Sequence, residues 1–510
     1  MPRPTSILLL PADRPRLSHF AFFLLGCLTT LAFAPFGLSL LILVVLVPFL
    51  YVCFTISPRD AAKHGFWFGF GLFLTGTYWI YISVVIFGQA PVWIALFLMI
   101  GLVLIMSVYF WILAWLISRL SHGEPWYLLA VAPAAWVIVE WARGWLFTGF
   151  PWMALGYSQV DSALGGWAPV LGVYGVSALI VLSGAAILVA IMTRGRQQIV
   201  AMTFVLLPGI AGAILKSVDW TRPAGEPLRA TIVQGGVSQD RKWLPEQFQP
   251  TLTFYRSETL KVADSDIVLW PEVAIPAVTD RVEGYIQLLE SDARANEQTI
   301  LFGILERVTE RGDDKPSVYN AIIGVDGSNR MVYRKRHLVP FGEYFPVPET
   351  VREWMRMLSL PHSDLSDGDD EQPLIQMAGG VKLASAICYE DAYAAEQLYA
   401  LPEAGILINV SNDAWFGDSI APHQHLQIAR MRSLEAGRFT IRATNTGVSA
   451  FIGPKGKVQQ TGPQFEPVTM TRSVQPMQGS TPYVIVGNWL ILIMSWVILG
   501  VFWLRSRANL

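Results

Sequence analysis

A cysteine stands where an apolar, strand-like run ends, in the segment Ala-Ser-Ala-Ile-Cys-Tyr-Glu-Asp that covers residues 384–391. The chain has three cysteines, Cys27, Cys53 and Cys388, and only the last lies in the second half. A thiol at a strand end, exposed on the loop that follows, is where a nucleophile would be placed. A cysteine after a strand is more often a core residue, so Cys388 alone is only a candidate nucleophile.

A carboxylate follows another apolar run, in Leu-Trp-Pro-Glu-Val-Ala-Ile-Pro over residues 269–276. Two prolines bracket Glu272 and make its loop stiff. Burial beside Trp270 would suit this carboxylate to general-base catalysis. Taken alone, Glu272 would more readily be interpreted as a surface acid on a turn.

A third motif, Tyr-Arg-Lys-Arg-His-Leu-Val-Pro-Phe-Gly-Glu-Tyr, covers residues 333–344. Lys335 could direct its ammonium into a site and stabilise the charge on a tetrahedral intermediate. Alone, this basic cluster is more typical of a solvated or membrane-surface face. Together the motifs supply a thiol, a base and a cation, each on its own strand-end loop. A histidine is not required if Glu272 takes the thiol proton and Lys335 lowers the thiol pKa.

Short β-rich runs alternate with polar segments of helix length between residues 218 and 480, which predicts an α/β domain whose sheets are covered by helices. Residues 446–458 predict a late hairpin with a Pro-Lys-Gly turn. The expected strands are 228–234, 266–270, 299–305, 318–325, 382–387 and 406–410, and the expected helices are 249–264, 282–295 and 423–438.

The rest of the chain has the composition of a membrane protein. Hydrophobic residues make up 53% of the 510 residues and charged residues only 15%, against about 25% in ordinary soluble proteins. We expect a membrane domain over 1–217, a catalytic domain over 218–480, and a last span with a tail over 481–510. The eight predicted spans are about 17–33, 38–56, 65–86, 91–118, 126–142, 167–192, 198–215 and 483–504.

Loop charges predict how these spans are oriented. Arginines and lysines gather before the first span and in the loops after the second, fourth, sixth and eighth, while the alternate short loops carry almost none except Arg143. The positive-inside rule then places both termini in the cytoplasm and residues 218–480 outside it. The net charge of -2 and the lack of a long basic run argue against a nucleic-acid partner.

The three motifs, in this order, resemble those of the nitrilase superfamily, whose Glu-Lys-Cys triad lies on an αββα sandwich. Seven spans before such a domain and one after it resemble the membrane-embedded branch, the bacterial apolipoprotein N-acyltransferases. The resemblance implies that Glu272 is the base, Lys335 the oxyanion-side lysine and Cys388 the nucleophile. Positions that the family uses to support the site or substrate are matched by Trp243, Glu343, Tyr389 and Glu390, and the motif Asn-Asp-Ala-Trp-Phe-Gly adds Asn412 and Trp415. Many relatives have threonine at Val273 and asparagine at Gly236, which affects only local loops.

The resemblance also implies partners and a location. The donor would be a phospholipid, preferably phosphatidylethanolamine, and the acceptor a diacylglyceryl-modified apolipoprotein, with the enzyme in the bacterial inner membrane and its catalytic domain in the periplasm. Neither a cofactor nor a metal would be needed. A membrane-anchored amidase is the nearest alternative, and a transporter or scaffold with an inactive domain is another. Residues 349–361 form an apolar arm beside two arginines, which predicts a lid over the site, with a buried core helix as the alternative.

Overall fold

The computed structural model describes residues 15–88, 90–309, 316–344 and 365–508. The predicted lid at 349–361 lies outside these residues. The described chain forms two compact units. The first comprises the residues up to Tyr81, Pro91–Asp219 and those from Ile485 onward, and the second comprises Ile82–Ala90 and Trp220–Val484.

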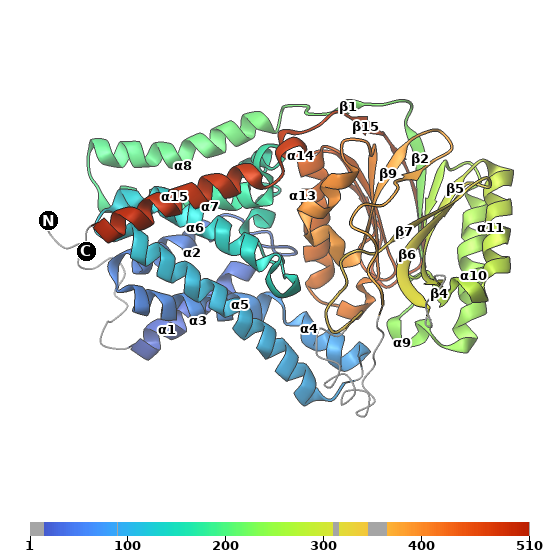
Figure 1. The fold of residues 1–510 in the computed structure, drawn as a ribbon, viewed down its shortest axis with the longest axis horizontal. Helices are drawn as coiled ribbons and strands as arrows, with labels where there is room; N and C mark the ends of the chain where they lie inside the picture. Colours follow the sequence, from blue (N-terminus) through green and yellow to red (C-terminus); the bar gives the residue numbers. More distant parts are fainter. Residues whose placement is uncertain (1–14, 89, 310–315, 345–364, 509–510) are drawn as a thin grey trace. The chain divides into compact units, whose positions relative to one another are not determined.

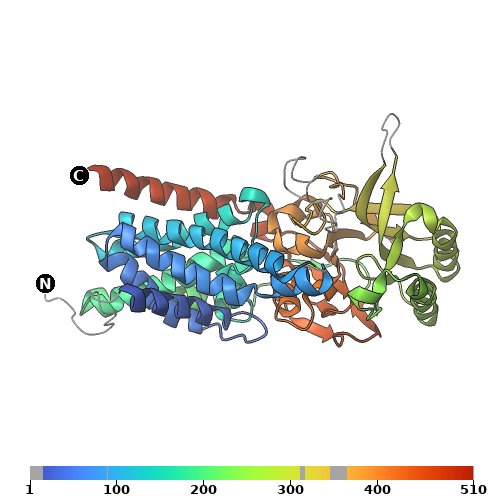
Figure 2. The same cartoon turned by 90° about the horizontal axis from the view of Figure 1, so that it is seen from below.

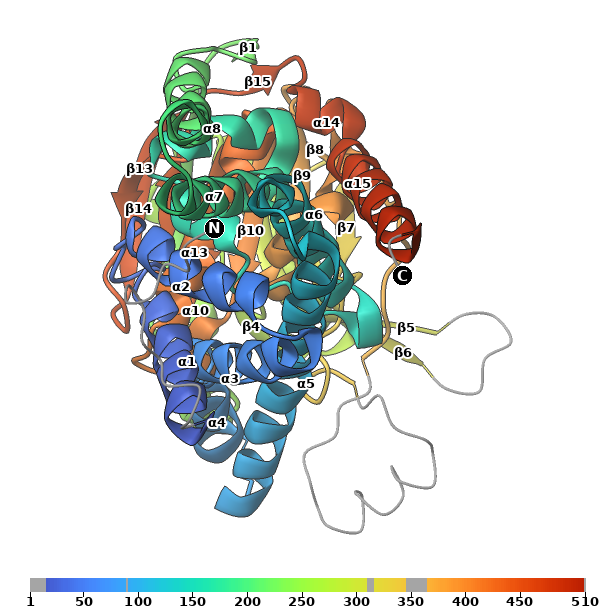
Figure 3. The same cartoon turned by 90° about the vertical axis from the view of Figure 1, so that its left-hand side faces the viewer.

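The first unit is a bundle of helices that run side by side (Figure 2), and Figure 3 looks along several of them. A short helix, α4 (Trp79–Ile82), lies at the boundary of the two units. The principal helices are α1 (Pro15–Thr30), α2 (Leu41–Thr55), α3 (Pro58–Gly76), α5 (Val92–Ser121), α6 (Leu128–Arg143), α7 (Ala168–Met192), α8 (Arg196–Leu215) and α15 (Trp489–Ala508).

Five helical segments of the described chain are long and apolar enough to cross a membrane, not the eight that the sequence predicted. They are Val92–Ser121, Pro125–Arg143, Ala163–Met192, Arg196–Leu215 and Trp489–Ala508. A sixth is added if Pro58–Gly76 and Trp79–Ile86, bent by 47°, count as one span. Two further predicted spans correspond to α1, of which 16 residues are described, and to the shorter apolar helix α2 with 15 residues.

Glycines allow the helices at the start of the bundle to pack closely. A Cβ on Gly65 or Gly69 of α3 would overlap Phe110 of α5, and one on Gly71 would overlap the carbonyl oxygen of Phe23 of α1. Small residues at helix interfaces let backbones approach in this way. These three glycines therefore allow α1, α3 and α5 to pack closely.

The second unit contains two large β-sheets and a short pair, β1 (Arg222–Pro223) with β15 (Met477–Gln478). One sheet has the order β14-β2-β3-β5-β6-β7, with β4 paired to β5, and the other has the order β13-β12-β11-β10-β9-β8. The first sheet contains β2 (Leu228–Gln234), β3 (Ile267–Leu269), β4 (Ile275–Val278), β5 (Thr299–Val308), β6 (Ser317–Val325), β7 (Arg330–Arg334) and β14 (Val468–Val474). The second contains β8 (Ile375–Gln376), β9 (Lys382–Ile387), β10 (Ile406–Ser411), β11 (Phe439–Thr444), β12 (Ala450–Ile452) and β13 (Val458–Thr461).

The two sheets face each other across one hydrophobic core. Ile232, Leu269 and Leu301 from one sheet and Ile408 and Ile441 from the other are fully or almost fully buried in it. Helices α10 (Pro245–Lys261) and α11 (Glu283–Asn296) cover the outer face of the first sheet, and α13 (Ala421–Ala436) covers the second (Figure 1). This is the predicted αββα sandwich.

The strand predictions agree with the structure most closely where a run is apolar and continuous. Residues 228–234 and 382–387 were predicted with the bounds of β2 and β9. The hairpin is confirmed, because β12 and β13 pair antiparallel and Gly456 of the turn has a φ of +71°. Because β9, β10 and β11 run parallel, their carboxyl ends share one edge of the sheet.

Candidate active site

Cys388 follows β9 directly and begins a tight turn. Its φ is 53°, in the left-handed region that residues other than glycine rarely adopt and that marks strained functional positions. The sequence predicted an exposed thiol, but Cys388 is only 8% exposed. The short turn places the side chain of Cys388 in the core between the sheets. There it belongs to the same buried cluster as Ile387 and Val410.

Glu272 lies three residues beyond the end of β3 and is also buried, with 6% exposure. Asn320 of β6 donates to its Oε1 at 2.7 Å, and the backbone N–H of Asn412 donates to its Oε2 at 2.7 Å. Each carboxylate oxygen is therefore held by one donor. Lys242 Nζ donates to the backbone carbonyl oxygen of Glu272 at 3.1 Å, which fixes the loop itself.

Lys335 follows β7 and is 1% exposed. Its Nζ donates to Glu343 Oε1 at 2.8 Å and lies 3.7 Å from Glu272 Oε1. Burial lowers the pKa of Lys335, but the negative charges of Glu343 and Glu272 outweigh burial and raise the pKa above its ordinary value. Lys335 is therefore an ammonium held between two carboxylates.

The charges of Glu272 and Lys335 both act on the Cys388 thiol. Burial raises the pKa of this thiol, and the negative charge of Glu272 raises it further, while Lys335 opposes the rise. The expected effect of Lys335 has the right sign but is smaller than the other two. The resting thiol is consequently protonated at neutral pH, and a base must remove its proton.

Glu390 connects the turn of Cys388 to the segment of Lys335. Its carboxylate accepts hydrogen bonds from the backbone N–H of Ile387 at 2.6 Å, from that of Arg336 at 2.7 Å and from the hydroxyl of Tyr333 at 3.0 Å. Burial raises the pKa of Glu390. This side chain touches the backbone on both sides of the site and so sets the spacing of the two loops.

The remaining predicted residues lie at different depths. Asn412, after β10, bonds Gln239 through its Nδ2 at 2.8 Å and is buried. Tyr389 packs edge-on against Tyr393, with ring centroids 5.1 Å apart. Trp243, at the end of α9 (Gln239–Lys242), is 51% exposed and Trp415 is 40% exposed. The two tryptophans are thus surface aromatics, whereas Glu272, Lys335, Cys388, Glu390 and Asn412 are buried.

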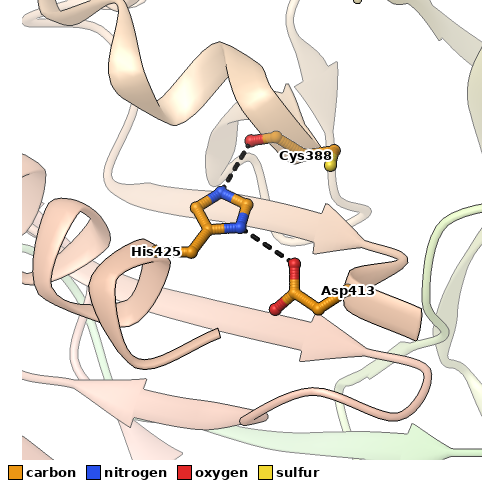
Figure 4. Close-up of side chains that lie close together, drawn as sticks. All are labelled: Cys388, Asp413 and His425. Carbon is orange, nitrogen blue, oxygen red and sulfur yellow. Dashed lines mark hydrogen bonds and ion pairs between the residues drawn. The ribbon is translucent and has the colours of Figure 1, made fainter. Parts of the chain in front are cut away.

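A second group, Asp413 and His425, lies against the backbone of Cys388 (Figure 4). The Cys388 sulfur, a carboxylate oxygen of Asp413 and a ring nitrogen of His425 could each bind a metal ion, and these atoms lie within 4.8 Å of one another. Both ring nitrogens of His425 are already bonded, Nδ1 to Asp413 at 2.9 Å and Nε2 to the Cys388 carbonyl oxygen at 3.0 Å. The arrangement therefore fits a hydrogen-bond network better than a metal centre.

Sequence reasoning missed Asn320, Lys242 and His425. Asn320 also donates to Glu343, at 3.0 Å, so one amide joins two of the predicted carboxylates. A polar side chain inside the apolar strand Ser317–Val325 was a signal that could have indicated Asn320. Lys242 precedes Trp243, a predicted site residue, and His425 lies in the predicted helix 423–438. The sequence around each of them gives no sign of a role in the site.

Two known protein families match segments of this chain. Residues 229–483 match the carbon-nitrogen hydrolase family, and residues 25–186 match the family described as the apolipoprotein N-acyltransferase N-terminal domain. An amidase of the nitrilase superfamily from Nesterenkonia is 16% identical, with a TM-score of 0.39 over 54% of this chain and 98% of its own. The sandwich and the first match define a protein of the carbon-nitrogen hydrolase class.

Full-length relatives narrow this class. An apolipoprotein N-acyltransferase of Methylococcus capsulatus is 40% identical over 95% of this chain and 95% of its own. One of Azotobacter vinelandii is 40% identical over 95% of this chain and 94% of its own. The chain belongs to the apolipoprotein N-acyltransferase family.

Proposed function

We propose that this chain is an N-acyltransferase. It moves a fatty acyl chain from a phospholipid, through a thioester on Cys388, to the α-amine of the diacylglyceryl-cysteine of an apolipoprotein. Family membership over nearly the whole chain supports the activity. The observation that carries the mechanism is that the buried Lys335 ammonium lies 3.7 Å from the buried Glu272 carboxylate and that the backbone of Cys388 is held at a strained φ of 53°. The charges of Glu272 and Lys335 both affect the pKa of the Cys388 thiol.

In the first half-reaction, Glu272 takes the thiol proton as Cys388 Sγ attacks the ester carbonyl carbon of the phospholipid. The carbonyl oxygen becomes an oxyanion, which Lys335 and the backbone N–H of Tyr389 stabilise. The C–O bond of the ester then breaks, and the departing lysophospholipid oxygen takes the proton from Glu272. The product is a thioester on Cys388.

In the second half-reaction, the neutral α-amine of the acceptor attacks the thioester carbonyl. Glu272 receives a proton from the attacking nitrogen and returns it to the sulfur as the C–S bond breaks. An amide is formed and the thiol is restored. Glu272 acts twice because Asn320 and the Asn412 backbone hold its two oxygens in one orientation.

The supporting residues divide into two groups in this proposal. Glu343 holds the Lys335 ammonium, Glu390 sets the spacing of the loops, and Asn412 orients Glu272. Trp243 and Trp415, both surface aromatics, contact the acyl chain or lipid at the entrance, where amphipathic rings are favoured. Tyr389 contributes its backbone N–H.

Membrane residence explains why a carbon-nitrogen hydrolase domain would carry a helical bundle. Both acyl substrates are held in a bilayer, so the catalytic unit must be tethered to one. Leu207 and Ile214 on α8 and Trp496 and Val497 on α15 are more than half exposed, which suits contact with lipid. We propose eight spans with both termini cytoplasmic and the catalytic domain on the periplasmic side of the bacterial inner membrane. Phosphatidylethanolamine is the proposed preferred donor.

Trapping the acyl-enzyme tests the proposal. The full chain, purified in detergent, is incubated with phosphatidylethanolamine that carries labelled acyl chains and then weighed intact by mass spectrometry. We expect one labelled acyl group on the wild type and on the matched control Cys27→Ala, and none on Cys388→Ala. An unmodified wild type, or an adduct that survives in Cys388→Ala, would overturn the mechanism.

Adding an acceptor separates the transferase from the amidase alternative. A synthetic diacylglyceryl-cysteine peptide should remove the label from Cys388 and gain it as an amide. Release of the label as free fatty acid at the same rate with and without the peptide would instead identify a hydrolase.

A further inference from the structure

The ring of His425 is held between an acid and the backbone of the nucleophile. His425 lies on α13 and is 1% exposed. Its Nδ1 lies 2.9 Å from Asp413 Oδ1, and its Nε2 lies 3.0 Å from the carbonyl oxygen of Cys388. Figure 4 shows the carbonyl oxygen of Cys388 turned toward the ring and the sulfur turned away from it.

Both of these contacts require the ring to donate. A backbone carbonyl oxygen has no proton, so Nε2 must carry the hydrogen of that bond. Asp413 also accepts from the Ser411 hydroxyl at 2.7 Å and from Arg442 at 2.9 Å. Arg442 is always positively charged, and its ion pair with Asp413 at 2.9 Å favours the ionised carboxylate over the protonated acid. Nδ1 must therefore carry a hydrogen as well.

A ring with a hydrogen on both nitrogens is an imidazolium, and the charges around it allow one in a buried place. Asp391 lies 3.5 Å from Arg442, which also bonds Asp413. A further buried cation, Arg432, also acts on Asp391 and pairs with Glu435 at 2.9 Å. Three acids thus stand with Arg442, Arg432 and His425. Buried charges persist when they are paired and hydrogen-bonded in this way.

The carbonyl oxygen that His425 binds belongs to the same peptide group as the backbone N–H of Tyr389. A cation on the oxygen of a peptide group draws electron density from its nitrogen and makes the N–H a stronger donor. Asn409 adds a weaker contact to the same oxygen at 3.4 Å. Because the peptide group is planar, holding the Cys388 carbonyl oxygen also fixes the direction of the Tyr389 N–H. These contacts hold the peptide group in place although the φ of Cys388 is strained.

We propose that His425 is a positioning residue, present as an imidazolium, that fixes and polarises the Cys388–Tyr389 peptide group and so strengthens the oxyanion donor. The proposal rests on the proposed function, in which the Tyr389 N–H binds the oxyanion of each tetrahedral intermediate. His425 forms no bond to substrate. It acts entirely through the peptide group.

The variant His425→Gln tests the charge, because glutamine can offer a neutral N–H at a similar reach. Loss of a whole oxyanion donor costs roughly 100-fold to 1,000-fold in rate, so weakening one should slow acylation of Cys388 by roughly 10-fold to 100-fold. The KM for phospholipid should change little. The matched control is His423→Gln, two residues away on the same helix and only half-buried.

A second reaction of the same thiol separates polarisation from simple support of the fold. Iodoacetamide alkylates Cys388 without forming an oxyanion, so its rate reports only the access and reactivity of the sulfur. We expect His425→Gln to alkylate within about threefold of the wild type while acylation falls. Unchanged acylation would overturn the proposal, and so would a parallel fall of both rates.

A measurement on the wild type keeps the proposal open to refutation if the variant does not fold. Nitrogen-15 NMR of the full chain, labelled at histidine, counts the ring hydrogens of His425 at neutral pH after the other histidines are assigned by single substitutions. A ring with one hydrogen would overturn the proposal. A wild type that forms no thioester at all would instead refute the proposed function.

Discussion

The Cys388 thiol is protonated at rest, so the first step of the proposed reaction requires a base. Burial and the charge of Glu272 hold the thiol pKa above its ordinary value, so a preformed thiolate is not the resting nucleophile. The carboxylate that disfavours the thiolate is also the group proposed to receive its proton. Proton transfer and attack on the ester should therefore occur together, which general-base catalysis allows.

The substitution Glu272→Gln should slow acylation of Cys388 by roughly 100-fold to 10,000-fold, the range for loss of a general base. The residual rate should rise with pH, because hydroxide must then remove a proton whose pKa is raised. Single-turnover acylation measured by mass spectrometry across the pH range checks both. The exposed Glu246→Gln is the control, and a variant that keeps the wild-type rate would remove Glu272 from the mechanism.

Lys242 gives a prediction about stability. Burial lowers its pKa from 10.5 to about 8. Between those two values the unfolded chain holds this proton and the folded chain does not, so the lysine makes folded stability rise with pH. Below pH 8 the buried charge costs about 3 kcal/mol, at 1.36 kcal/mol for each pKa unit.

Lys242→Met removes this charge. The Tm of the variant minus that of the wild type should be most positive below pH 8 and should fall as pH rises toward 10. Thermal unfolding in detergent at several pH values measures the difference. Lys261→Met, at a lysine whose side chain is 67% exposed, is the control. Parallel profiles for Lys242→Met and the wild type would contradict the prediction.

At the scale of elements, the site depends on how closely one strand approaches the loop of Glu272. Gly303 of β5 donates its N–H to the Pro271 carbonyl oxygen at 3.2 Å. A Cβ at Gly303 would lie 2.4 Å from the backbone nitrogen of Val273 and 2.7 Å from the Cα of Glu272. Backbone atoms cannot give way as a flexible side chain can, so the loop itself would have to move.

Gly303→Ala should therefore destabilise the fold by about 1–3 kcal/mol, as overpacking does. It should also slow acylation by at least roughly 10-fold, because a displacement of about 1 Å at a catalytic group can cost 100-fold. Gly284→Ala on α11 is the matched control, since nothing lies within 4 Å of its added Cβ. Unfolding in detergent and single-turnover acylation check the pair. Wild-type behaviour of Gly303→Ala would show that the loop adapts.

Local sequence predicts those elements whose signal is local. The apolar runs at 228–234 and 382–387 mark their strands within the bounds observed. Asn320 and Glu272 are 48 residues apart and His425 and Cys388 are 37 apart, so their contacts leave no local pattern. Hydropathy also joined residues 65–86 into one span. The structure instead places Ile82–Ala90 with the second unit, where Ser83 donates to the Trp415 carbonyl oxygen at 2.7 Å across 332 positions.

At the scale of the whole molecule, the two units serve substrates that are both lipids. The proposed chemistry of Glu272, Lys335 and Cys388 would also suit a soluble amide, but the described chain has at least five helical segments apolar enough for a bilayer. A donor and an acceptor that diffuse in the same membrane can reach one site in turn, which suits a reaction with a covalent intermediate. The side of the membrane on which Cys388 lies then decides which lipoproteins it can modify.

The proposed orientation can be tested with single cysteines in a chain whose three natural cysteines are replaced by alanine. Ser328 is exposed in the turn between β6 and β7, and Arg59 is exposed at the start of α3. By the positive-inside rule, Ser328→Cys should react with a membrane-impermeant maleimide added to intact spheroplasts, and Arg59→Cys should react only after permeabilisation. The same two variants control each other, because both sites should react once the membrane is opened. A protected Ser328→Cys with a reactive Arg59→Cys would place the catalytic domain in the cytoplasm, and the periplasmic proposal would then have to be abandoned.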